Sequence, residues 1–270
     1  MADEYSVSPP GTPPAGNLAP ESRTVEAGRG ASWWLEAWRL FTPRGGTWLL
    51  IALILCAVVL VGAIVSMVPV LGQLAALACE ILWPVLIGGL MLGCRAIDRG
   101  NPLLVGHLFA GFSQRTGPLL IAGAIYTGLL LLISVAIVGM MIAIFGAGIL
   151  DVLAGSAEPT QTGVAFSSAV AAVLLGFLFF LLLLVPLVMS IWFAPALIML
   201  GGTTAGVAMK ASFGGCVRNI VPFLVYGVIF IVLAIIATIP FGLGWFALAP
   251  VTIASIYASY CDIFEDRDSA

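Results

Sequence analysis

Long uninterrupted apolar runs alternate with short polar connections along most of this chain. At a helical rise of 1.5 Å per residue, each run is long enough to cross a hydrocarbon core about 30 Å thick. The runs predict six membrane-spanning helices, at residues 47–67, 71–94, 118–149, 166–199, 220–239 and 242–263. The expected fold class is therefore all-α, a polytopic membrane helix bundle.

Amphipathic segments precede the first, third and fifth runs. The first begins after Ser32 and reads WWLEAWRLF, in which the tryptophans suit a helix lying along the membrane surface. The second begins at Asn101 and Pro102, and its leucines and phenylalanines form one stripe. The third is capped by Thr203 or Thr204. We therefore expect three interfacial helices.

Each amphipathic segment leads through an arginine to a Gly- or Pro-containing start of an apolar hairpin. These arginines are Arg44, Arg115 and Arg218. A unit of two spans returns the chain to the side from which it started, so all three units begin on the same side. The order predicts three repeated units, each an interfacial helix plus a helical hairpin, related about the membrane normal.

Composition and charge support this membrane topology. The chain has 270 residues, of which 61% are hydrophobic and 9% are charged, whereas a soluble domain has about 25% charged residues. All ten basic residues fall on one side of the six-span arrangement, and only Asp151 and Glu158 fall on the other. The positive-inside rule then places both termini in the cytoplasm.

Two polar tails flank the membrane domain, which spans residues 32–263. Residues 1–31 are rich in proline and glycine and predict a disordered cytoplasmic tail, because they bury too little apolar surface to offset ordering. Residues 264–270 predict an acidic cytoplasmic tail. The five cysteines lack metal-ligand spacing and are interpreted as unpaired apolar residues.

The stretch GLMLGCRAIDRGNPLLVGHLFAGF, with AGRGASWWLEAWRLF before it and MKASFGGCVRNIVPF after it, resembles an uncharacterised family of bacterial six-helix inner-membrane proteins. The resemblance covers about residues 25–265. More distantly, the repeated helix-plus-hairpin pattern is similar to the membrane domain attached to some glycerophosphodiester phosphodiesterases. The resemblance implies a bacterial inner (cytoplasmic) membrane protein, and it implies no enzymatic activity, cofactor or catalytic residue.

Glu80 is the one ionisable residue well inside a predicted span. A charged carboxylate there costs at least about 2.5 to 3.5 kcal/mol on insertion scales, so we expect it to be protonated, hydrogen-bonded or facing water. One interpretation is a proton or cation site beside Pro84, with Ala76 and Gly88 allowing another helix to approach. The alternative is a structural role, in which a protonated carboxyl group bonds to a neighbouring Ser or backbone carbonyl, or in which the side chain reaches toward the outer surface.

The basic residues at the ends of the spans are candidate contacts for anionic lipid headgroups. They are Arg44, Arg95, Arg99, Arg115, Lys210 and Arg218. The same charges can instead serve only to set topology. His107 stands alone beside glycine and leucine, and it is interpreted as an interfacial residue in preference to a pH sensor or metal ligand.

Two functions from different classes follow. The first is a non-enzymatic structural, lipid-interacting or assembly role in the bilayer, without cofactor. The second is a small transporter or channel for a lipid-like or apolar substrate that uses Glu80. No nucleotide or nucleic-acid fingerprint and no cluster of acid, base and nucleophile occurs, so enzymatic and nucleic-acid functions are not expected.

Overall fold

The computed structural model describes residues 20–153 and 161–265, and over these residues it contains helices and no strand. This confirms the all-α prediction. Six of the helices are long and apolar enough to cross a membrane. Large aliphatic side chains such as Leu60, Ile64 and Ile231 are more than half exposed, as expected for helices whose surroundings are lipid.

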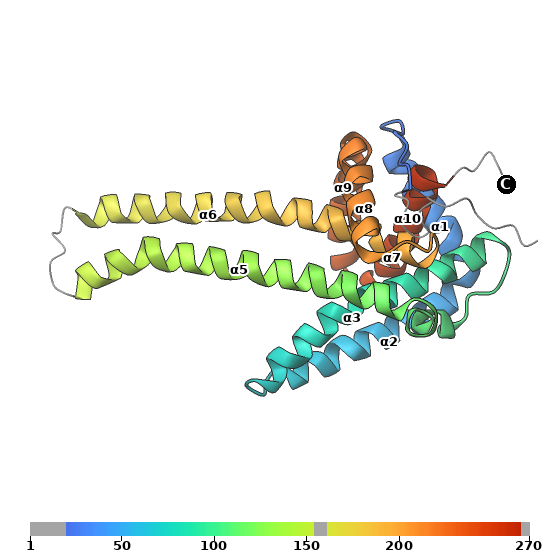
Figure 1. Ribbon diagram of the computed structural model, residues 1–270, viewed down its shortest axis with the longest axis horizontal. Coiled ribbons are helices and arrows are strands. Elements are labelled where there is room, and N and C mark those ends of the chain that lie inside the picture. Colours follow the sequence, from blue (N-terminus) through green and yellow to red (C-terminus); the bar gives the residue numbers. More distant parts are fainter. Residues whose placement is uncertain (1–19, 154–160, 266–270) are drawn as a thin grey trace, which may run out of the picture. The chain divides into compact units, whose positions relative to one another are not determined.

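The helices follow one another as shown in Figure 1. Their bounds are α1 Arg29–Phe41, η2 Thr42–Arg44, α2 Gly45–Val65, α3 Leu71–Asp98, η3 Val105–Phe109, α4 Gly111–Gln114, α5 Thr116–Leu153, α6 Gln161–Trp192, α7 Ala194–Met199, α8 Ala205–Arg218, α9 Ile220–Thr238 and α10 Trp245–Phe264. The predicted spans agree with α2, α3, α5, α9 and α10 to within a few residues, and the loop residues 154–160 lie outside the described part.

The predicted fourth span is interrupted. Helix α6 ends at Trp192, and α7 begins at Ala194 with Pro195 in its first turn. Proline has no N–H for the preceding turn and its ring crowds the carbonyl four residues earlier, so a helix breaks or kinks there. The apolar run predicted as one span over residues 166–199 therefore contains a helix break.

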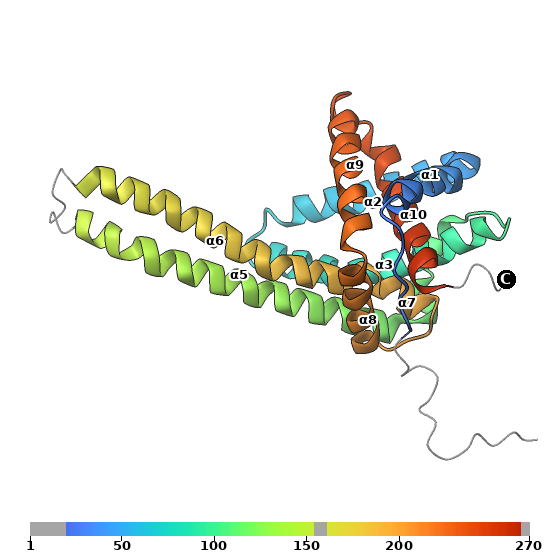
Figure 2. The ribbon, with the colours of Figure 1, turned by 90° about the horizontal axis from the view of Figure 1, so that it is seen from above.

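The chain divides into two compact units. Unit 1 comprises residues 1–123 and 190–270, and unit 2 comprises residues 124–189. Within unit 2, α5 and α6 run side by side in both views (Figures 1 and 2), and Gly176 lies against the side chain of Met141. All sites considered below belong to unit 1.

Helix α1, which was predicted to lie along the membrane surface, packs against protein on the face that carries Trp33 and Trp34. It packs against α9 and α10, and both Trp33 and Trp34 are buried in protein. The ring of Trp34 stacks on Tyr226 with centroids 4.7 Å apart. The close packing depends on Gly30, where a Cβ atom would lie 2.1 Å from the carbonyl oxygen of Pro222.

The second predicted interfacial helix is also different. Residues 101–115 form the short η3 and α4 with turns around them. Two glycines explain this, because a Cβ on Gly89 of α3 would lie 2.3 Å from the carbonyl oxygen of His107, and one on Gly111 would lie 2.1 Å from that of Val85. The segment follows the backbone of α3 closely, which a regular amphipathic helix resting on its side chains would not do.

The third predicted segment is a regular helix, as expected. Thr204 occupies the position before α8, which ends at Arg218, but its side chain makes no capping hydrogen bond. The predicted cap by Thr203 or Thr204 is therefore not formed by a side chain, and the hydroxyl of Thr203 instead donates to the carbonyl oxygen of Leu197. Met209 is buried, whereas Phe213 and Val217 on the same stripe are exposed. The predicted apolar stripe is therefore covered by protein at Met209 and uncovered towards the end of α8.

The predicted boundary between the N-terminal tail, residues 1–31, and the membrane domain is wrong by a few residues. The first helix begins at Arg29, three residues before Ser32. Upstream of it, the backbone N–H of Arg23 donates to the carbonyl oxygen of Ile263 at 2.8 Å, and that of Val25 donates to Oδ1 of Asn219 at 2.8 Å. Residues 20–28 are thus tied to the membrane domain, while residues 1–19 and 266–270 lie outside the described part.

The backbone supports the predicted repeat. Where each amphipathic segment meets a span, one residue leaves the helical region in nearly the same way: Arg44 at φ −129° and ψ 24°, Arg115 at φ −137° and ψ 35°, and Asn219 at φ −118° and ψ 32°. The seventh residue after each of them is buried; these residues are Ile51, Ala122 and Tyr226. The same bend followed by the same buried position is expected of units with a common plan.

Candidate functional site

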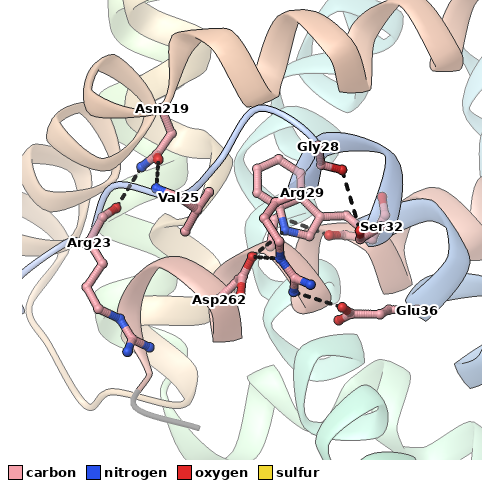
Figure 3. Close-up of polar contacts among 11 residues, drawn as sticks. Arg23, Val25, Gly28, Arg29, Ser32, Glu36, Asn219 and Asp262 are labelled. Atoms are coloured by element: carbon pink, nitrogen blue, oxygen red, sulfur yellow. Dashed lines mark hydrogen bonds and ion pairs between the residues drawn. The ribbon is translucent and has the colours of Figure 1, made fainter. Parts of the chain in front are cut away.

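The end of unit 1 that carries the charges is held together by a polar network centred on Asp262 of α10. The Nε of Arg29 donates to Oδ2 of Asp262 at 2.6 Å, and the indole Nε1 of Trp33 donates to the same oxygen at 2.9 Å (Figure 3). A second guanidinium nitrogen of Arg29 bonds to Glu36 at 2.8 Å. Charged groups taken partly out of water need such partners, so the network fixes α1 on α10.

Asn219 fixes the chain that precedes α1. Its side chain is fully buried between α8 and α9. The amide nitrogen donates to the carbonyl oxygen of Arg23 at 2.9 Å, and the amide oxygen accepts the N–H of Val25 (Figure 3). The amide nitrogen also donates to the carbonyl oxygen of Gly215 at 2.9 Å. One side chain therefore satisfies three backbone groups that would otherwise be unpaired.

Helices α3 and α10 are joined at the same end. The hydroxyl of Tyr257 donates to Oδ2 of Asp98 at 3.0 Å, and Arg95 forms an ion pair with Glu265. Arg95 is half-buried. Its guanidinium is therefore committed to a protein partner, which separates it from the other candidate lipid contacts.

Four of the six candidate basic residues are exposed. They are Arg44, Arg99, Arg115 and Lys210, whose side chains make no hydrogen bond or ion pair with any described residue. Arg218 is exposed as well, but it donates to the carbonyl oxygen of Ser22 at 2.9 Å. The predicted set thus divides into four residues with free charges, one bonded to the N-terminal segment and one ion-paired.

Exposed apolar side chains accompany these charges in each repeat. They are Leu35 and Trp38 in the first repeat, Leu104, Phe109 and Phe112 in the second, and Phe213 and Val217 in the third. Aromatic and aliphatic side chains beside basic ones are typical of segments in the headgroup region. The interfacial assignment therefore rests on these residues, since Trp33 and Trp34 are buried.

Glu80 lies on the outward-facing side of α3 and is exposed. It lines a groove between α2 and α3 together with Gly62, Ala76 and Trp83. Among the described residues, none makes a hydrogen bond or ion pair with its carboxylate. Of the structural alternatives, the bond to a neighbouring Ser or carbonyl is therefore not formed there, and a side chain that reaches toward the outer surface stays open. Gly88, which was expected to allow another helix to approach, lies against Leu119 of α5.

His107 has a local structural role. Its Nδ1 accepts the backbone N–H of Leu104 at 3.1 Å, which caps η3. Partial burial lowers the pKa of His107 from its ordinary value. Both effects favour the neutral imidazole.

Sequence reasoning missed Asp262 and Asn219. Asp262 is a lone acidic residue just inside the last predicted span, and Asn219 is the polar residue between Arg218 and the fifth span. A polar residue at the end of a span could therefore have marked both positions. Their partners, Arg29 and Trp33 for Asp262 and Arg23 and Val25 for Asn219, are distant in sequence and could not be predicted. In the part of the chain that the structure describes, no group of three or more His, Cys, Asp and Glu side chains could hold a metal ion.

Comparison of the chain with protein-family models, with curated proteins and with solved structures found no match. The resemblance to bacterial six-helix inner-membrane proteins therefore stays a prediction.

Proposed function

We propose that this multi-pass membrane protein has a non-enzymatic, lipid-binding role, in which its repeated units hold anionic headgroups at the cytoplasmic face of a bacterial inner membrane. The observation that carries the proposal is the recurrence of an exposed arginine at the bend before a span. Arg44 and Arg115 occupy equivalent bends, and Arg218 immediately precedes the third.

The free charges can act on a lipid phosphate at little cost. Arg44, Arg115 and Lys210 are exposed and have no protein partner among the described residues, so binding a headgroup breaks no ion pair. Each basic residue near an anionic surface contributes about 1 kcal/mol. A guanidinium also bonds phosphate in a bidentate manner. The exposed Trp38 and Phe109 would anchor the same segments in the headgroup region.

The test is retention of anionic lipid by the purified protein. Replacing Arg44, Arg115 and Lys210 together by glutamine is expected to lower the occupancy of phosphatidylglycerol in native mass spectra. The affinity should fall by about fivefold for each charge removed, because each contributes about 1 kcal/mol. Zwitterionic lipid serves as the reference ligand in the same spectra.

Arg95→Gln is the matched control for this experiment. It removes one positive charge from the same end of unit 1, but that charge is paired with Glu265. Lipid occupancy should therefore stay near the wild-type level in the control. Equal losses in the triple variant and in Arg95→Gln, or no loss in either, would contradict the proposal.

A second function, transport of a lipid-like or apolar substrate, is favoured by one observation. The groove between α2 and α3 contains Glu80, and its remaining walls are largely apolar. This groove uses none of the basic residues on which lipid retention depends.

A further inference from the structure

The groove between α2 and α3 has the size of a small-ligand site. Its volume is about 370 Å³, and it is lined by aliphatic residues of α2, including Leu55 and Val58, and by Glu80 and Trp83 of α3. Small residues such as Gly62 and Ala76 leave the space between the two helices. Small-molecule sites are commonly apolar concavities of about 300 to 1,000 Å³ with few polar groups.

Glu80 lies at hydrocarbon depth in this groove. It precedes Arg95 by fifteen residues of continuous helix, a distance of about 22 Å along the axis at 1.5 Å per residue. With Arg95 at one edge of a hydrocarbon core about 30 Å thick, Glu80 remains several ångströms inside the opposite edge. An ionised carboxylate at that depth requires a counter-charge.

The two helices that form the groove supply no such counter-charge. No lysine or arginine occurs between Arg44 and Arg95, and no described residue pairs with the carboxylate. The carboxylate is also exposed to the groove. A cation that comes from the membrane phase can therefore reach it.

Trp83 adds a second feature that favours an organic cation. It lies one helical turn after Glu80, lines the same groove and is 45% exposed. An indole face attracts an alkylammonium group through its ring quadrupole. Carboxylate and indole together suit an ammonium group, while Leu55 and Val58 offer apolar surface to an alkyl chain.

We propose that the α2–α3 groove binds lipophilic amines, with the ammonium group between Glu80 and Trp83 and the alkyl chain along the apolar wall of α2. The chemical class is a monocationic amphiphile that enters from the bilayer. This inference deepens the second candidate function by naming a substrate class. It is independent of the lipid-binding arginines.

The probe is an alkyltrimethylammonium with a fourteen-carbon chain and a diazirine near its charged end, photolysed with the protein in zwitterionic lipid nanodiscs. Trypsin cleavage at Arg44 and Arg95 isolates both walls of the groove in one peptide, because no basic residue lies between them. Crosslinking to this peptide should saturate with probe concentration. An excess of the unlabelled amphiphile should compete it away.

Glu80→Gln should reduce the crosslinked fraction about tenfold, and Trp83→Leu should reduce it several-fold, as expected for loss of the counter-ion or of the ring face. Glu26→Gln is the matched control, since Glu26 is an exposed carboxylate outside the spans, and it should leave the yield unchanged. The Arg44, Arg115 and Lys210 triple variant should also crosslink normally, which separates this inference from the lipid proposal.

Two results would overturn the inference. One is an undiminished yield in Glu80→Gln. The other is equal labelling by an uncharged diazirine alcohol of the same length, which would show simple partitioning of an alkyl chain. Because the Glu80 carboxylate has no bond among the described residues, the glutamine variant should retain the wild-type melting temperature, and this can be checked in parallel.

Discussion

Replacing Gly30 by alanine is expected to destabilise the protein by about 3 kcal/mol, because overpacking against a rigid neighbour costs about 1 to 3 kcal/mol and occasionally more. The added methyl group would lie 2.1 Å from the carbonyl oxygen of Pro222, and backbone cannot move aside as a flexible side chain can. Helix α1 should separate from α9. The melting temperature in detergent, together with trypsin cleavage at Arg39, measures the effect.

Gly28→Ala provides the matched control for this substitution. Gly28 has a helical backbone conformation, and a Cβ atom there would meet nothing within 4 Å. The control should melt within a degree or two of the wild type. Equal melting temperatures for Gly30→Ala and the wild type would contradict the close packing of α1 on α9.

Asp262→Asn is the second substitution with a large expected effect. It leaves the Arg29 guanidinium without its main counter-charge and weakens the acceptor for the Trp33 indole. Asp262 is only 16% exposed, and loss of one partner from a largely buried pair costs a few kcal/mol. Since Arg29 is 32% exposed and partly solvated, we expect a loss of about 2 kcal/mol, measured by thermal unfolding.

A double substitution of Arg29 and Asp262 tests whether the loss of stability comes from breaking the ion pair between them. In an Arg29→Gln background the same Asp262→Asn change should cost less, because the charge it would leave unpaired has already been removed. Glu26→Gln is again the control, as an exposed carboxylate near Arg29. Additive losses from Arg29→Gln and Asp262→Asn would show that the two side chains do not interact.

The spans could be predicted because membrane insertion is decided locally. A run of apolar residues of sufficient length crosses the bilayer whatever its partners, and turns such as that at Phe241 and Gly242 are marked by proline and glycine in the sequence. The helix break near Pro195 follows from the same local rules. Each of these features depends only on residues that are close together in the sequence.

The burial of α1 could not be predicted in the same way. Tryptophan suits both a headgroup region and a protein core, so WWLEAW alone does not distinguish them. The decision depends on Gly30 meeting Pro222 and on Trp33 meeting Asp262, which lie about 190 and 230 residues away in the chain. Contacts of that kind are a property of the folded arrangement.

In the candidate site too, the sequence identifies individual residues but not the contacts that they make in the folded protein. Glu80 is recognisable in sequence because a carboxylate inside a span is costly, yet the groove that it lines exists only once α2 packs beside α3. Arg95 and Arg99 are both basic residues at one span end. Only the ion pair with Glu265 shows that the charge of Arg95 is already compensated.

The central claim is that three even-crossing units present their bends and basic residues on the cytoplasmic side, and labelling of introduced cysteines tests it most directly. In a variant without the five native cysteines, cysteine at Met67 or Phe241, at the tips of the α2–α3 and α9–α10 hairpins, should react with an impermeant maleimide in intact spheroplasts. Cysteine at Asn101 should react only after the membrane is opened. Labelling of Asn101 from outside, or of Met67 and Phe241 from opposite sides, would contradict the account.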